Sequence, residues 1–236
     1  LRNSWLDRDL GLSGRVVVRA DGAGSGERVE VRLVHVDEPI LRIPQLAIHL
    51  DRGVNEEGLK LNAQQHLAPV WGLGEPTEGD FARYLAERCG VPVEAVLAWD
   101  VMAHDLTPPT VAGVDGSLVA SARIDNLVSC WAGTEALVRV ARLGDEGRGN
   151  PPVAVLALFD HEEVGSRSAS GAASALLPTV LARIATGLGW GADGLARSLA
   201  QSFCASADGA HATHPNYADR HEPAHQVAID GGPVIK

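Results

Sequence analysis

The sequence has 236 residues, of which 45% are apolar and 21% charged, and its formal net charge is −10. This length suffices for one large or two modest domains. The acidity argues against nucleic-acid or anionic-membrane partners, because such surfaces need clustered Lys and Arg. No apolar run has the length of a membrane helix. Three cysteines without C-x-x-C spacing exclude a disulfide framework and a thiolate zinc site, so we expect a reducing, cytoplasmic location.

The first part of the chain, to about residue 110, is rich in β-branched residues with partial alternation, which predicts strands. Residues 81–87 are typical of a helix that Gly90 ends, and residues 91–103 fit either a helix or a strand. The predicted strands are 15–19 (RVVVR), 29–37 (VEVRLVHVD) and 41–50 (LRIPQLAIHL), with a turn at 21–26 (DGAGSG).

Helices and strands alternate in the second part, which predicts a parallel α/β layer. The boundary between the two parts falls between about residues 106 and 120, and we place it after residue 112. The predicted elements are a helix at 125–143, a linker at 144–152, a strand at 153–159, a helix at 171–184 and a short strand at 203–207.

Two adjacent acids, Glu162 and Glu163, follow the apolar run 153–159. Open α/β sheets hold their ligands at the carboxyl ends of the strands, and carboxylates there stay ionised at low cost only beside a cation. Adjacent side chains diverge, so one acid can bind a metal ion while the other acts as general base on the attacking water. The alternative is an exposed loop with two solvated acids.

Three other positions have both a chemical and a structural interpretation. Asp125 precedes an apolar-periodic helix, either as an N-cap or as a carboxylate that bridges two metal ions. Asp208, His211 and His214 form a ligand set suited to zinc or cobalt, or else belong to an ordinary surface loop with an incidental H-x-x-H. His49 lies inside the predicted strand 41–50, where a hydrogen-bonded core histidine is the default interpretation. Phosphate-binding and serine-nucleophile motifs are absent from the sequence.

Seven segments, in the same order along the whole chain, resemble the aspartyl aminopeptidase family, the two-metal aminopeptidases of metallopeptidase family 18. They are SWLDRDLGLSGRV (4–16), LVHVDEPILRIPQLAIHL (33–50), NAQQHLAPV (62–70), ARIDNLVSCWAGTEAL (122–137), LFDHEEVGSRSASGAAS (158–174), SADGAHATHPNYADRHE (206–222) and GPVIK (232–236).

The resemblance implies a centre with two divalent metal ions, zinc first, with cobalt or manganese as alternatives. It makes Asp125 the bridging carboxylate, Glu162 the general base, and Glu163 and Asp208 the terminal ligands. The family's metal histidines match no segment of this sequence, so we expect the chain to be a piece of a longer protein. Two neighbours of the acids also depart from the family pattern: His161 stands where an Asn is usual, and Gly209 where a Met is usual.

The same resemblance implies substrate-binding roles for His49, His211 and Lys236, with His49 reaching the active site of a partner subunit. It implies an α/β fold, in which residues 113–236 form part of the catalytic domain, a mostly parallel sheet flanked by helices. Residues 1–112 then form an inserted β-rich dimerisation or lid domain, with about nine residues joining from the catalytic domain. The implied assembly is a homo-oligomer built from dimers, up to a dodecamer.

The expected function is therefore that of a zinc metalloaminopeptidase, a peptidase that removes N-terminal residues, preferably Asp or Glu, from peptide substrates. Two alternatives stay open. One is another two-metal exopeptidase or deacylase on a similar sheet. The other is a non-catalytic assembly subunit, because the metal histidines are absent from the sequence.

Overall fold

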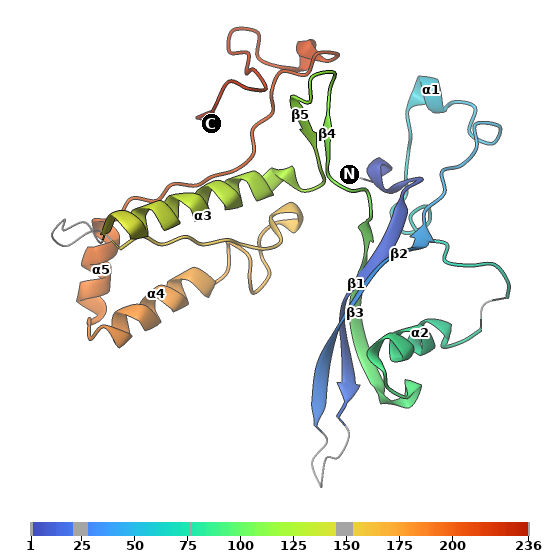
Figure 1. Ribbon diagram of the computed structural model, residues 1–236, viewed down its shortest axis with the longest axis horizontal. Helices are drawn as coiled ribbons and strands as arrows, with labels where there is room; N and C mark the ends of the chain where they lie inside the picture. The colour runs from blue at the N-terminus through green and yellow to red at the C-terminus, as the bar shows by residue number, and fades with distance from the viewer. Residues whose placement is uncertain (1, 21–27, 76, 145–152, 236) are drawn as a thin grey trace. The chain divides into compact units, whose positions relative to one another are not determined.

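The structure is a computed structural model that describes residues 2–20, 28–75, 77–144 and 153–235 (Figure 1). The chain forms two compact units, Leu1–Ala122 and Arg123–Lys236. The division lies beyond the predicted boundary at residue 112, so the hairpin of β4 (Thr110–Ala112) and β5 (Leu118–Ala120) belongs to the first unit.

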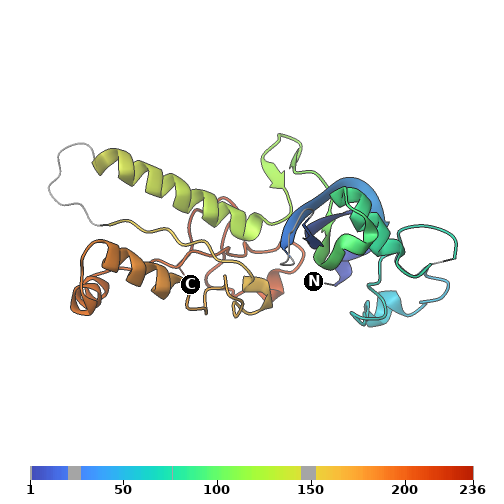
Figure 2. The same cartoon turned by 90° about the horizontal axis from the view of Figure 1, so that it is seen from below.

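The first unit is built on a three-stranded antiparallel sheet of order β2-β1-β3, formed by β1 (Asp9–Arg19), β2 (Val29–Arg42) and β3 (Val96–Asp105). Helix α2 (Asp80–Cys89) covers one face of this sheet (Figures 1 and 2). Alternate residues of each strand therefore meet the helix, and the opposite face stays open. The core comprises Leu10, Leu12, Val16, Val18, Val34, Val36, Leu41, Ile43 and Leu85.

Most of the predicted elements of this unit are present. The strands predicted at 15–19 and 29–37 are confirmed within β1 and β2, and residues 91–103 contribute a 3₁₀ turn, Val93–Ala95, followed by β3. Gly90 ends α2 in the left-handed conformation, with φ 65°, which glycine adopts without strain. The turn predicted at 21–26 lies outside the described residues.

The strand predicted at 41–50 is wrong beyond Arg42. The chain leaves the sheet at Pro44, which has no N–H to give to a ladder, and residues 48–50 form a turn. Leu46, Ile48 and Leu50 are all exposed, so this apolar alternation does not face the core of the unit. Helix α1 (Val54–Glu57) and the 3₁₀ helix Asn3–Trp5 complete the regular elements described here.

The second unit consists of helices joined by long segments without regular structure. They are α3 (Ile124–Gly144), α4 (Leu176–Gly187) and α5 (Ala192–Ala200), with 3₁₀ turns at Glu162–Val164 and Ala218–Arg220. The helix predicted at 125–143 is confirmed, whereas the one predicted from residue 171 begins at Leu176, because residues 171–174 are held in turns. Helix α5 was not predicted, and the linker 144–152 lies outside the described residues from 145 onward.

The predicted strands 153–159 and 203–207 are not strands in the structure. A strand exists only where a neighbour completes its hydrogen-bond ladder, and the described part of this unit contains no such neighbour. Residues 153–159 instead run beside α3 (Figures 1 and 2), where Leu156 lies against Gly133. The parallel sheet therefore stays a prediction. None of the described helices is long and apolar enough to cross a membrane.

Candidate metal centre

The start of α3 departs from helical geometry at the predicted bridging carboxylate. Asp125 has φ −83° and ψ 108°, Asn126 has φ −115° and ψ 25°, and the peptide bond between them is cis. The carboxylate of Asp125 is exposed, and regular helix begins after Asn126. The sequence at this point therefore produces a bend that presents two polar side chains before the apolar helix continues.

Asn126 joins this bend to the other predicted ligand segment. Its Nδ2 donates a hydrogen bond of 2.7 Å to Oδ1 of Asp208, 82 positions further along the chain. The backbone N–H of Gly209 donates to the same oxygen at 2.8 Å. Two donors on one carboxylate oxygen fix its direction, so Asp208 is held in place by its neighbours.

Gly209 brings Asp125 into the same group. A Cβ atom built on Gly209 would lie 2.9 Å from Oδ1 and 3.0 Å from Cγ of Asp125. Such a distance leaves no room for a side chain without movement of Asp125, so the glycine permits the close approach of the two segments. The two segments thus meet twice, through Asn126 with Asp208 and through Asp125 with Gly209.

One polar atom in this contact lacks a partner. Oδ1 of Asn126 is buried and accepts no hydrogen bond from the described residues. A buried oxygen without a donor costs roughly 1–3 kcal/mol, so its presence beside two carboxylates marks a position where a further group would be accommodated. The sequence did not single out Asn126, because its amide side chain is neither an acid nor a base.

Glu162 and Glu163 lie in the 3₁₀ turn Glu162–Val164, and both are exposed. The turn is enclosed by left-handed residues, His161 with φ 64° and Gly165 with φ 98°. Two hydrogen bonds within the loop hold it in shape. His161 Nδ1 and Ser168 Oγ are 2.6 Å apart, and the N–H of Ser166 donates to the carbonyl of His161 at 2.9 Å. The two acids therefore stand on an ordered loop.

Glu163 does not join the other two ligands at metal-binding distance. Among the described residues, one group of three candidate ligands has its atoms within 4.8 Å of one another, and it consists of His35, Asp37 and His104 in the first unit. The structure brings Asp125 and Asp208 together through their neighbours and leaves Glu163 apart from them.

The predicted substrate-binding residues are widely separated in the chain. His49 is exposed on the turn 48–50, so the default interpretation as a core histidine in a strand is wrong. His211 is exposed three residues after Asp208, and Lys236 lies outside the described residues. The structure thus places His49 in one unit and His211 in the other.

The sequence of the chain also matches known proteins along its whole length. A family model described as aminopeptidase I zinc metalloprotease (M18) matches residues 1–236. The chain belongs to the M18 family. A probable M18 family aminopeptidase 2 of Streptomyces coelicolor is 50% identical over 237 residues, which cover 100% of this chain and 52% of the relative. The protein of the same name in Mycobacterium leprae is 51% identical over 234 residues, covering 99% of this chain and 52% of the relative.

A solved M18 structure shares the fold. The structure of Chaetomium thermophilum mApe1 has a TM-score of 0.76 and 30% identity, and the match covers 98% of this chain and 54% of that one. The α/β fold class is thereby shown at the level of the family. The chain spans about half the length of the curated M18 relatives that it matches.

Proposed function

We propose that this chain provides the carboxylates of a two-metal aminopeptidase centre, with zinc as the metal. M18 membership supports the class of enzyme, a zinc metallopeptidase. The observation that carries the proposal is the hydrogen bond from Asn126 to Asp208 beside Asp125. Two acids that are distant in sequence are brought near each other there through Asn126 and Gly209, an arrangement that a bound cation would stabilise.

The residues present suit such a cation. Asp125, Asp208 and Glu163 supply oxygen donors, which zinc accepts alongside nitrogen donors. Asn126, whose side-chain oxygen has no donor among the described residues, directly follows Asp125 and donates to Asp208. Glu163 would complete the set by movement of its exposed loop.

Divalent ions held at these carboxylates would polarise the scissile carbonyl and lower the pKa of the attacking water. Glu162 would accept the proton of that water and return it to the leaving amine. As the neighbour of Glu163 in the same 3₁₀ turn, Glu162 would serve as the base without serving as a metal ligand. The contact between His161 and Ser168 holds the loop together, so both acids would move with it as one unit.

Asp and Glu at the peptide N-terminus are the proposed substrates, in a cytoplasmic homo-oligomer. His211, close to Asp208, and Lys236 would contact the substrate, and His49 would act from a partner subunit. A solved structure of S. cerevisiae mApe1, which is 22% identical to this chain, is a dodecamer.

The base assignment is tested in the complete protein that carries this chain. Glu162→Gln should lower kcat by roughly 10²- to 10⁴-fold, because it removes general-base catalysis, while the zinc content stays unchanged. Glu87→Gln, at an exposed position on α2, is the matched control and should retain full turnover. Turnover near the wild-type value in Glu162→Gln would show that the base is another group.

The substrate and the metal are tested with the same protein. N-terminal Asp and Glu reporters should be released faster than Leu and Ala reporters, and a chelator should abolish release until zinc is restored. Faster release of neutral residues would overturn the acidic preference alone. Activity that survives full removal of metal would overturn the proposed metal chemistry, and a complete protein with no activity on any reporter would favour the assembly subunit.

A further inference from the structure

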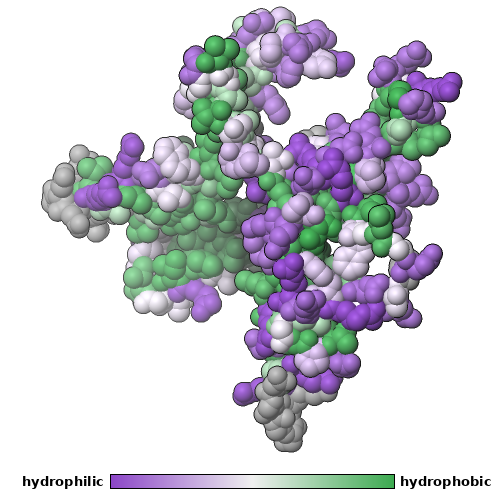
Figure 3. Space-filling view, turned by 45° about the vertical axis from the view of Figure 1, so that its right-hand side comes forward, coloured by the Kyte–Doolittle hydropathy of each residue, from purple (hydrophilic) through white to green (hydrophobic). Residues whose placement is uncertain are grey.

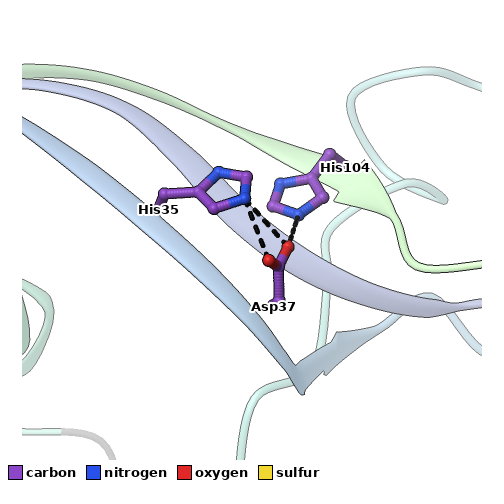
Figure 4. Close-up of side chains that lie close together, drawn as sticks. All are labelled: His35, Asp37 and His104. Atoms are coloured by element: carbon purple, nitrogen blue, oxygen red, sulfur yellow. Dashed lines mark hydrogen bonds and ion pairs between the residues drawn. The ribbon is translucent and has the colours of Figure 1, made fainter.

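A group of side chains of types that can bind metal lies in the first unit, on the sheet face opposite the core. His35 and Asp37 are alternate residues of β2, and His104 lies on β3. All three project from the same face, across the central strand β1 (Figure 4). None of them belongs to the centre proposed above, and the family resemblance gave them no role.

The two histidines converge on one carboxylate. Nε2 of His35 lies 3.0 Å from Oδ1 and 3.1 Å from Oδ2 of Asp37. Nε2 of His104 lies 3.2 Å from the same Oδ1. The imidazole rings are parallel, with an interplanar angle of 1° and centroids 5.1 Å apart. Figure 4 shows both rings directed toward the carboxylate.

The central strand is shaped to allow this approach. Gly11 is opposite His104 in the ladder, and a Cβ on Gly11 would lie 2.7 Å from Nε2 of that ring. The absence of a side chain therefore lets the His104 ring reach across β1 toward β2. Ser13, two residues further on the same face, has its Oγ 3.1 Å from Nδ1 of His104.

A bulge directs Asp37 toward the rings. Leu10 pairs with Leu41 and Leu12 pairs with Val36, so residues 37–40 of β2 stand opposite Gly11 alone. Bulges of this kind redirect side chains and are frequent beside functional sites. Pro39 within the bulge has no N–H to donate, so the ladder is interrupted at this point.

We propose that His35, Asp37 and His104 bind one divalent transition-metal ion of the zinc class. Two imidazole nitrogens and a carboxylate form a ligand set that zinc uses when a fourth position is left to water. Neighbouring ligands of a tetrahedral zinc ion are about 3.3 Å apart, and the nitrogen–oxygen distances of 3.0 and 3.2 Å already match that edge.

Hydrogen bonding prepares His104 for this role. A ring N–H that donates to a neighbouring oxygen fixes the tautomer in which the other nitrogen is free to bind metal. Oγ of Ser13 can accept from Nδ1, which leaves Nε2 directed toward Asp37. In this tautomer Nε2 of His104 would be free to bind the ion together with Asp37.

The exposed fractions of the side chains leave the ion an entrance. His104 is 18% exposed and fixed between the strands, whereas His35 is 65% and Asp37 70% exposed. The fourth position would face solvent. Another histidine–carboxylate pair, His225 with Glu222 at 2.7 Å, is not part of a group of three and serves as a comparison.

The experiment separates this site from the proposed catalytic centre. The chain is prepared with Asp125→Asn, Glu163→Gln and Asp208→Asn, and Zn²⁺ binding is measured by equilibrium dialysis with metal analysis. One equivalent should remain bound in the micromolar range. His35→Gln on this background should weaken binding by tenfold or more, whereas His225→Gln should leave it unchanged. Circular dichroism establishes that each variant is folded.

A second measurement reports the ligands themselves. Co²⁺ bound to the background chain should give a visible absorption band that Zn²⁺ displaces and that His35→Gln removes. Ser13→Ala should weaken Zn²⁺ binding by roughly 10- to 100-fold, as expected for a group that orients a ligand. The proposal is overturned if the folded background chain binds no Zn²⁺ below millimolar concentration, or if His35→Gln binds it as tightly as the background does.

Discussion

The two units of this chain differ in whether their own residues are enough to form a paired sheet and a buried core. In the first unit the strands of an antiparallel sheet pair with one another, and helix α2 covers their apolar face and contributes Leu85 to a core of nine residues. In the second unit the described residues include one buried apolar side chain, Ala185. Antiparallel strands find partners a short distance along the chain, whereas parallel strands need neighbours supplied by long connections.

The apolar surface of the second unit shows what this difference leaves exposed. Val128 and Trp131 of α3 are 58% and 66% exposed, and Phe203 is 92% exposed. Figure 3 shows hydrophobic surface gathered on the part of the chain that carries the long helices. A soluble protein rarely leaves so much apolar surface uncovered. Because the relatives are about twice as long, we propose that additional family sequence packs on this surface.

Preparing the two units as separate fragments should show the largest difference between them. Residues 1–122 alone should unfold cooperatively in urea, because their core is internal to the unit. Residues 123–236 alone should bind a hydrophobic dye and lack a sharp transition, since their apolar faces are uncovered. Circular dichroism and dye fluorescence give both results. A cooperative transition in the second fragment without dye binding would mean that it completes a core by itself.

A pair of leucines on opposite sides of the sheet sharpens the comparison within the first unit. Leu10 is fully buried and Leu33 is 85% exposed. Leu10→Ala should lower the free energy of unfolding by about 2–5 kcal/mol, because it leaves a cavity. Leu33→Ala should change it by less than about 0.5 kcal/mol. Urea titrations measure both, and equal effects would show that the open face is covered in solution.

The elements that the sequence predicted correctly are those whose pattern is local. The apolar periodicity of residues 125–143 and the alternation in 29–37 each identified their element. The strand predictions at 153–159 and 203–207 depended on neighbours that a local pattern does not contain. The strand predicted at 41–50 was wrong beyond Arg42 for a different reason. The apolar residues after Pro44 alternate with other residues, but they face solvent.

The candidate site divides in the same way. The acids were identifiable because carboxylates after apolar runs are costly without a cation. Asn126 and Gly209 were not, since their importance lies in one hydrogen bond and one close approach between segments. The group of His35, Asp37 and His104 depends on which strands are neighbours, and only the register across β1 reveals it.

Removal of the Asn126 amide tests whether its hydrogen bond orients Asp208 for metal binding. Asn126→Ala deletes the donor to Asp208 and should weaken metal binding by roughly 10- to 100-fold. Metal titration of the complete protein measures this. Asn216→Ala, an exposed position in the same segment as Asp208, is the control and should bind normally. Equal affinities of the two variants would mean that Asp208 needs no such support.

The smallest expected effect concerns an ionic contact at the end of β3. Burial raises the pKa of Asp105, but hydrogen bonds from Thr107 and Arg8 outweigh it, so the pKa lies below its usual 3.8. Thr107 Oγ1 donates to the carboxylate at 2.8 Å. Because the folded-state pKa is lowered, the stabilisation is present above about pH 4 and is lost as the pH falls through the folded-state value.

Asp105→Asn should therefore cost roughly 1 kcal/mol near pH 7 and less near pH 3, where the wild-type carboxylate is becoming protonated as well. The matched control is Asp100→Asn, on the same strand as Asp105. It removes a solvent-exposed ion pair with Arg15, whose atoms are 3.1 Å apart. Exposed pairs contribute little, so its unfolding free energy should stay close to that of the wild type at both pH values. A loss in Asp105→Asn that is equally large at both pH values would assign the effect to packing, because an ionic contribution must fade as the carboxylate gains its proton.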